Sequence, residues 1–189
     1  HSLTVKDFVK SINNYDGAKV LISVPSSRIL NKMLGQTKLL SQLKDMGFDV
    51  LHITSKFGAY VNQTKVNRTT FFNTLKEWGC QTARKFVIFH YSILSEGINV
   101  SGLSHTLLLR NLNIVEMAQT IGRVIRLHKE DQQNIFNGLI PAGVVSLYRK
   151  SSGNCVIPTH KNYGTKTINR IKRITNDIFT EGNHTTAYC

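Results

Sequence analysis

Three polar side chains recur at helical spacing near the middle of the chain. Gln119, Arg123 and Arg126 occupy positions i, i+4 and i+7, which share one face of an α-helix. Arginine stays charged and offers a planar fork of donors, so two guanidinium groups on one face suit a chain of phosphates. Gly122, directly before Arg123, allows a ligand or another backbone to approach closely. A basic helix face exposed to water has the same spacing, so the pattern alone leaves both interpretations open.

A second polar segment, Ser-Glu-Gly-Ile-Asn, begins at Ser95, shortly after the apolar run Lys85–His90. The run is typical of a buried parallel strand, and ligands bind in loops at the carboxyl ends of such strands. Hydroxyl and backbone N–H groups in such a loop suit contacts with phosphate or sugar. The alternative is an ordinary turn, in which Gly97 and Asn99 serve only local geometry.

Cations also recur at helical spacing near the C-terminus. Lys166, Arg170 and Arg173 lie at i, i+4 and i+7 within Thr165–Phe179, opposite much of an isoleucine face. Such a stripe suits a nucleic-acid backbone. The alternative is a helix that docks on the sheet through its isoleucines and solvates its other side with these charges.

The composition agrees with a polyanionic partner. The 189 residues include 24 Lys and Arg against 11 Asp and Glu, which gives a formal net charge of +13. Nucleic acid is the commonest partner of such a chain, although a domain can also be basic without binding one. No apolar run approaches the roughly 18 residues of a membrane helix, so we expect no membrane partner. The widely spaced Cys80, Cys155 and Cys189 argue against a disulfide framework or a zinc site and fit a reducing cytoplasm.

The elements that position these groups alternate between strand and helix. Apolar runs predict five strands, at Lys19–Val24, Phe48–Ile53, Lys85–His90, His105–Leu109 and Gly143–Tyr148. Helical patterns occupy Thr4–Asn13, the stretch that Ser26 would cap, the stretch around Phe71–Trp78, Ile114–Leu127 and Thr165–Phe179. Alternation of this kind predicts an α/β fold, a parallel sheet with helices on both faces.

Finer details of the helices and loops are also predicted. Thr4 and Asp7 form a pair like a capping box, and Gly79 is expected to close its helix. Polar loops are expected at Lys56–Arg68 and Ser151–Gly164. We divide the chain into a domain of residues 1–150 and a basic loop and C-terminal helix of residues 151–189, which packs on the domain or extends it.

Taken together, these stretches resemble superfamily 2 helicases. Ser95–Asn99, a strand, and then Gln119–Arg126 are similar in order and spacing to motifs V and VI of that family, and Val20–Pro25 is similar to motif IV. The resemblance covers Lys19–Leu127 and implies a RecA-like second motor domain. The Gln-led motif VI resembles DNA helicases of the phage branch-migration and RecG/UvrB-like type, which favours DNA over RNA and a bacterial or phage-infected cytoplasm.

The resemblance implies a role for each matched residue. Arg126 would be an arginine finger that reaches the γ-phosphate of ATP, and Arg123 would share that task or contact the phosphates beside it. Gln119 would lie at the domain interface near the nucleotide, and Gly97 would line the cleft. The family usually has Asp where this chain has Asn99, which puts the ribose contact at that position in doubt.

The resemblance also implies partners. Ser92 or Ser95 would donate to the nucleic-acid backbone. ATP and Mg²⁺ would be bound mainly by an N-terminal RecA-like domain of the same parent protein. The chain has no GxxxxGK[ST] sequence and no Asp-Glu pair after an apolar strand, so this stretch alone is not expected to hydrolyse ATP.

Two other functions fit the residues. A pure nucleic-acid-binding module with a degenerate helicase domain would tolerate the loss of Arg123 and Arg126. A different α/β enzyme, such as a sugar-phosphate transferase, would need its own acid or base in a cleft, and the sequence offers no convincing candidate.

Overall fold

The computed structural model describes residues 1–91, 100–110, 116, 120, 127–149, 153–157 and 164–178. Its centre is one seven-stranded sheet with the order β4-β3-β2-β5-β1-β6-β7. The strands are β1 (Lys19–Ser23), β2 (Asp49–Thr54), β3 (Gly58–Val61), β4 (Thr64–Val66), β5 (Phe86–His90), β6 (His105–Leu108) and β7 (Asn154–Val156). The pairings are parallel except β2 with β3 and β3 with β4, which are antiparallel.

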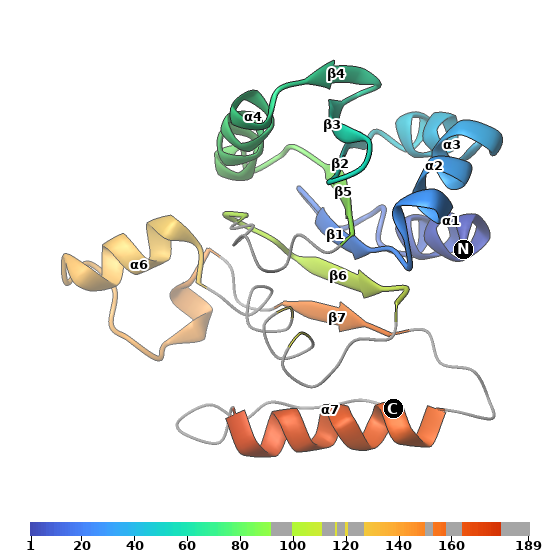
Figure 1. Ribbon diagram of the computed structural model, residues 1–189. Coiled ribbons are helices and arrows are strands. Elements are labelled where there is room, and N and C mark those ends of the chain that lie inside the picture. Colours follow the sequence, from blue (N-terminus) through green and yellow to red (C-terminus); the bar gives the residue numbers. More distant parts are fainter. Residues whose placement is uncertain are drawn as a thin grey trace.

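Helices cover both faces of this sheet (Figure 1). Helices α1 (Ser2–Ser11), α2 (Ser27–Gln36) and α3 (Leu39–Asp45) lie on one side, and α4 (Arg68–Cys80) lies on the other. The described chain continues with α6 (Lys129–Phe136), a short 3₁₀ helix η2 (Val145–Leu147) and α7 (Gly164–Ile178). The predicted fold class, a mainly parallel α/β sheet between two helical layers, is confirmed.

Alternating side chains of strand β1 pack into two separate cores. Val20 and Ile22 of β1 pack with α1, α2 and α3. Leu21 packs with Phe71 and Leu75 of α4. Successive side chains of a strand point to opposite faces, so a strand covered on both sides must be apolar at every position. This requirement explains the uninterrupted apolar run that predicted the strand.

The stretch expected to be a polar loop, Lys56–Arg68, instead holds the hairpin β3–β4. Its two turn residues, Asn62 and Gln63, have φ angles of 45° and 73°. A two-residue turn with both φ angles positive matches the right-handed twist of a hairpin. Asparagine tolerates this conformation well, whereas glutamine seldom adopts it. The usual Gly signal is missing at the second position, so the hairpin could not be recognised from the turn sequence.

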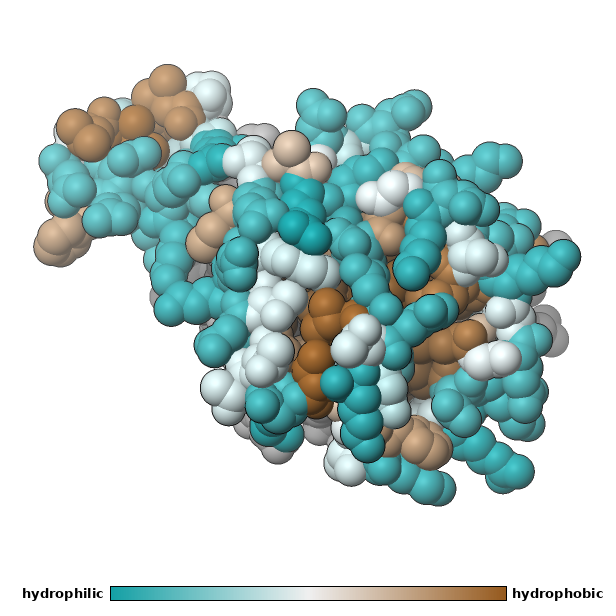
Figure 2. Space-filling view, turned by 90° about the horizontal axis from the view of Figure 1, so that it is seen from above, coloured by the Kyte–Doolittle hydropathy of each residue, from teal (hydrophilic) through white to brown (hydrophobic). Residues whose placement is uncertain are grey.

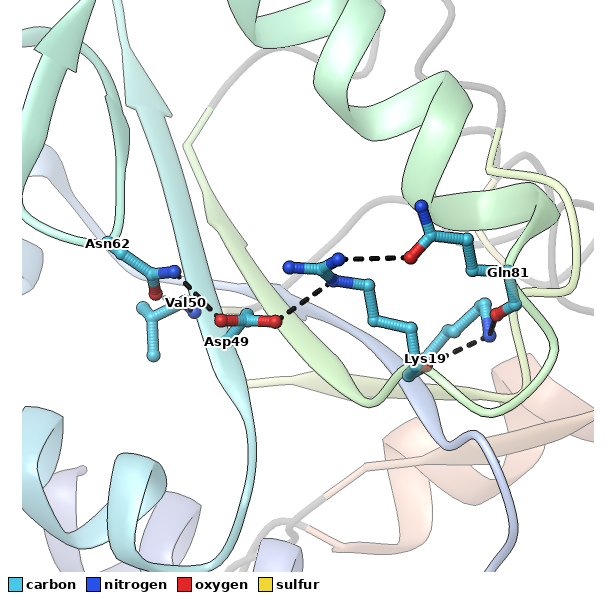
Figure 3. A network of polar contacts seen from close by, with 6 residues as sticks. Lys19, Asp49, Val50, Asn62 and Gln81 are labelled. Atoms are coloured by element: carbon cyan, nitrogen blue, oxygen red, sulfur yellow. Dashed lines mark hydrogen bonds and ion pairs between the residues drawn. The ribbon is translucent and has the colours of Figure 1, made fainter.

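A polar network fastens the hairpin turn to the amino ends of the strands (Figure 3). Asn62 accepts from the Val50 N–H at 2.9 Å and donates to the Asp49 carboxylate at 2.8 Å. Arg84 donates to the other Asp49 oxygen at 3.0 Å and to the Gln81 side chain at 2.9 Å. These bonds link β2, the hairpin turn and the segment between α4 and β5.

A buried lysine extends the network to β1. Lys19 is 2% exposed, and its ammonium donates to the carbonyls of Gly17, Gln81 and Arg84 at 2.9 to 3.1 Å. Burial, together with the charge of Arg149, lowers the pKa of Lys19 to about 8. Three hydrogen bonds to backbone carbonyls therefore compensate for the hydration that the buried ammonium loses.

Two predictions about the later elements are wrong. Gly143–Tyr148 is not a strand, since η2 lies within it and the Leu147 side chain is 54% exposed. Its apolar residues therefore do not mark a sheet core. Strand β7 lies instead within the expected loop Ser151–Gly164 and pairs with β6. It has only three residues, too few to show a period.

Two predictions about helix ends are also wrong. Gly79 lies inside α4 and does not end it. A Cβ at Gly79 would be 2.9 Å from the Ser101 carbonyl oxygen, so this glycine allows a loop to approach the helix closely. The expected capping box of Thr4 and Asp7 is absent, because α1 already begins at Ser2.

The part of the molecule that contains α6 projects from the sheet. Figure 1 shows α6 to one side of the strands, and Figure 2 shows hydrophobic surface on the same projection. Phe136 and Leu139 are 90% and 72% exposed. None of the described helices is long and apolar enough to span a membrane.

Histidines that are partly or fully buried make the stability of the fold depend on pH. Burial lowers the pKa of both His52 and His105 to about 4, from 6.5. The unfolded histidine takes up a proton near pH 6.5 while the folded one stays neutral, so protonation favours unfolding. The free energy of unfolding should thus be highest above pH 6.5 and fall towards pH 4, by at most about 1.4 kcal/mol per pH unit for each group.

Urea unfolding of wild type and His105→Gln at several pH values between 4 and 7.5 measures this effect. The variant removes one of the histidines with a lowered pKa, so its free energy of unfolding should fall less steeply across that window. Equal slopes in the two proteins would contradict the assignment of His105 as a buried neutral histidine.

Candidate nucleotide and nucleic-acid interface

The carboxyl ends of β1 and β5 meet through a buried side-chain pair. The Ser23 hydroxyl lies 2.9 Å from Nε2 of His90, and the two residues are neighbours in the parallel register. Both are at most 1% exposed. Each is followed directly by a loop at the ligand-binding edge of the sheet. The pair therefore sets the relative position of the two loops.

An arginine connects the loops that follow β5 and β6. The Arg110 guanidinium lies 5.1 Å from the centre of the Tyr91 ring, a distance at which cation and ring attract each other. It also lies 3.6 Å from the Glu116 carboxylate. Arg110 thus contacts both Tyr91, directly after β5, and Glu116, in the segment that leads to Gln119.

The loop after β1 leads directly into a capped helix. Ser26 has an extended backbone, and its hydroxyl accepts from the Ile29 N–H at 3.1 Å. This satisfies one of the free N–H groups at the start of α2. The prediction that Ser26 caps this helix is confirmed. The segment compared with motif IV, Val20–Pro25, therefore runs from β1 to the capped start of α2.

The remaining predicted site residues of the central region lie outside the described residues. These residues are Ser92, Ser95, Gly97, Asn99, Gln119, Arg123 and Arg126. Their described neighbours show where the segments begin. His90 ends β5 at the carboxyl edge, and the Thr120 hydroxyl donates to the Glu116 carbonyl at 2.8 Å, four residues back. Glu116 and Thr120 are both helical, as predicted for the stretch Ile114–Leu127.

The C-terminal cations lie on the predicted helix. In α7, Lys166 and Arg173 are exposed, and Arg170 is half-buried. Ile174 is 1% exposed, so the isoleucine face is the side that packs. Figure 1 shows α7 on the β7 side of the sheet. Lys166, Arg170 and Arg173 are therefore brought together along one helix, away from the side of the sheet that ends in β4.

The described residues offer an anion-binding group more readily than a metal site. Among them, no cluster of three or more His, Cys, Asp or Glu side chains could hold a metal ion. Nη1 of Arg110 is buried and has no hydrogen-bond partner within the same described set. A buried donor of this kind suits an anion rather than a cation.

Sequence reasoning missed the residues that join the loops. His90, Tyr91 and Arg110 belong to no recurring spacing, and their importance comes from strand ends that are adjacent only in space. One signal was available, because all three stand at or just beyond the carboxyl end of a predicted strand. Polar or aromatic residues at such positions deserve a place in a predicted site.

Comparison with protein families gives a match to the "Helicase conserved C-terminal domain" over residues 4–128. The match ends at His128, just before α6. It therefore includes β1 to β6, the hairpin β3–β4 and all the predicted site residues except those on α7. Comparison with curated protein sequences gives no match.

Solved structures with the same fold include helicase and related ATPase domains. The C-terminal part of the Fun30 ATPase domain aligns with a TM-score of 0.53, 16% identity, 89% coverage of this chain and 43% coverage of that one. The C-terminal domain of the DEAD-box protein Dbp5 aligns with a TM-score of 0.51, 13% identity, and 97% and 81% coverage. A further match is the ATP-dependent Type ISP restriction-modification enzyme LlaBIII bound to DNA, with a TM-score of 0.51, 10% identity, and 94% and 12% coverage. This chain thus spans less than half of the Fun30 structure.

The buried pair at the strand ends predicts a specific stability effect. Ser23→Ala should lower the free energy of unfolding by about 1 to 3 kcal/mol, because it leaves Nε2 of His90 without this buried partner. Ser41→Ala is the matched control, since the Ser41 hydroxyl is exposed and bonds only the Lys38 carbonyl. Urea unfolding of the two variants measures the difference. Equal, small effects would show that the pair does not hold the loops.

Proposed function

Because the chain belongs to the helicase conserved C-terminal domain family, we propose that it is the second motor domain of an ATP-dependent superfamily 2 helicase or translocase. The family match carries this proposal. The fold supports it, because the chain leaves β5 and β6 at the carboxyl edge of the sheet before it reaches the two motif-like segments. The activity would belong to a longer parent protein whose first motor domain supplies the phosphate-binding loop that this sequence lacks.

We assign the nucleotide-facing roles to the two motif-like segments. Arg126 acts as the arginine finger, and Arg123 assists it at the neighbouring phosphates. Gln119 lies near the nucleotide, and Gly97 and Asn99 line the cleft. ATP supplies the phosphoryl group whose charge these donors stabilise. Nη1 of Arg110 is buried and lacks a hydrogen-bond partner among the described residues, which supports an anion-binding role for this edge.

The nucleic acid would be held by hydroxyls and by a cationic stripe. Ser92 and Ser95 would donate to the strand backbone, and Lys166, Arg170 and Arg173 would neutralise phosphates. The net charge of +13 and the placement of the three cations along α7 support this. We propose DNA over RNA as the substrate because motif VI begins with Gln119, the form found in the DNA helicases that the chain resembles. On the same resemblance, we propose a bacterial or phage-infected cytoplasm as its location.

Loss of the arginine finger should abolish hydrolysis while binding survives. We expect Arg126→Ala in the parent protein to lower the ATPase rate stimulated by single-stranded DNA by about a thousandfold or more. Lys44→Ala removes an exposed cation of α3 and serves as the charge-matched control. ATP turnover and DNA affinity would be measured for all three proteins.

The pattern of results separates the motor from its rival. Reduced ATP turnover with unchanged DNA binding in Arg126→Ala supports the assignment of Arg126 as the arginine finger. Hydrolysis that is absent, or indifferent to Arg126, together with salt-sensitive binding would identify a binding module without a nucleotide role.

The C-terminal stripe should control the salt dependence of binding. Replacing Lys166, Arg170 and Arg173 by Gln should weaken binding to single-stranded DNA uniformly across sequences. It should also reduce the slope of log K against log salt by up to about 0.7 for each lost phosphate contact. The control replaces three exposed lysines of other helices with Gln, namely Lys10, Lys44 and Lys76. Equal slope changes in the two triple variants would mean that only net charge matters and that α7 forms no specific contact.

A further inference from the structure

A groove of about 270 Å³ lies between α2 and the hairpin side of the sheet. Its floor includes His52 of β2 and Tyr60 of β3, which are directly paired across the two strands. Their rings are stacked, with centroids 4.6 Å apart and planes 10° from parallel. The groove is thus built around an aromatic stack on the face that α2 covers.

The groove begins at the ligand-binding edge of the sheet. Ser27 at the start of α2, Thr54 at the end of β2 and Phe57 in the following turn form that end. Gly35 and Gln63 line the opposite end. A strand that passes along the carboxyl edge, where the motif-like segments begin, would therefore pass the open end of the groove.

The lining of the groove suits an uncharged, planar, polar-edged ligand. Among the residues that the structure describes, no lysine, arginine, aspartate or glutamate lines it. Burial lowers the pKa of His52 to about 4, so this ring is neutral near pH 7. A phosphate would lose its hydration here without a compensating charge. Aromatic faces, in contrast, stack on nucleobases whatever their sequence.

Amide and hydroxyl groups are available at the groove for the edge of a base. Within the described part of the chain, the side chains of Asn31, Tyr60 and Gln63 make no hydrogen bond. Amide side chains pair well with the donor and acceptor edges of bases. Gln63 also holds a φ of 73°, which disfavours glutamine. Glycine would adopt this turn without strain, so glutamine at this position costs stability.

Cations stand outside the groove. Arg28 and Lys32 are exposed on α2, and Lys56 is exposed in the turn after β2. A strand with its phosphates near these side chains could turn one base inward. The volume agrees, because sites for drug-sized ligands measure about 300–1,000 Å³, and one nucleobase with its sugar is smaller.

We infer that the groove between α2 and the β3–β4 hairpin binds one unpaired nucleobase of the nucleic-acid strand. The base extends the stack of His52 and Tyr60, and Asn31 and Gln63 contact its polar edge. This inference rests on the proposed function, because it gives the grip on the strand a base-binding element besides the phosphate contacts. A flipped base would hold the strand against slipping while the motor domains open and close.

Gly35 allows the groove to be blocked without disturbing the fold. A Cβ at Gly35 meets nothing within 4 Å, and its backbone is helical with a negative φ. Gly35→Phe would fill the groove, whereas Gly35→Ala leaves it open. Both substitutions replace a glycine inside a helix, which favours the helix slightly. Thermal unfolding of both variants checks that the fold is intact.

The test uses the 189-residue chain and a single-stranded DNA of about 12 nucleotides with one 2-aminopurine, whose emission is quenched by stacking. We expect wild type and Gly35→Ala to quench the emission on binding. Gly35→Phe should restore the emission and bind at least about fivefold more weakly. An abasic strand should bind all three proteins equally.

Two other results would overturn the inference in different ways. If wild type binds the strand but Gly35→Phe quenches and binds like Gly35→Ala, the groove takes no base, and the proposed motor function is unaffected. If wild type binds no single strand at any salt concentration, the base site and the proposed grip on nucleic acid are both wrong.

Discussion

The parallel pairing of β1 with β5 and β6 is the constraint on which the rest of the structure depends. Parallel strands end at the same edge, so the loops after Ser23, His90 and Leu108 must lie side by side although they are far apart in sequence. Because the sheet is covered on both faces, these strands are mainly apolar, and Thr106 of β6 is a buried exception. Other buried polar side chains of these strands lie at strand ends, and at the carboxyl ends the Ser23–His90 pair and Arg110 connect one loop to the next.

Hydrogen bonds of charged side chains hold the opposite edge of the sheet, where β1 and β2 begin. Lys19, Arg84 and Asp49 use charged groups to hold the hairpin turn, the end of α4 and two strands together. Arg84 also lies 3.8 Å from the ring centre of Trp78. Charged hydrogen bonds thus fasten the amino edge of the sheet, whereas the carboxyl edge is where the chain leaves β1, β5 and β6.

Prediction from sequence succeeded where burial dictates residue type. The strands β1, β2, β5 and β6 and the helix α7 were found because a covered strand or a packed helix face must be apolar at fixed spacing. The hairpin β3–β4 was missed because its strands are short and partly exposed, and its Asn62–Gln63 turn lacks glycine. Strand β7 was missed and a strand at Gly143–Tyr148 was wrongly predicted, because apolar residues there are exposed and do not report on the sheet core. The base-binding groove depends on the hairpin, so no sequence pattern could reveal it. The motif-like segments remain predictions, since they lie outside the described residues.

We propose that this domain closes on a first motor domain when nucleotide and nucleic acid are both bound. The most direct test is a titration of the labelled first motor domain of the parent protein with this chain, followed by fluorescence anisotropy. A non-hydrolysable ATP analogue and single-stranded DNA are added separately and together. We expect both ligands together to tighten the association of the two domains by at least about tenfold. Replacing Arg123 and Arg126 by Ala should remove this increase in affinity. An affinity that is the same with and without the ligands would contradict this proposal.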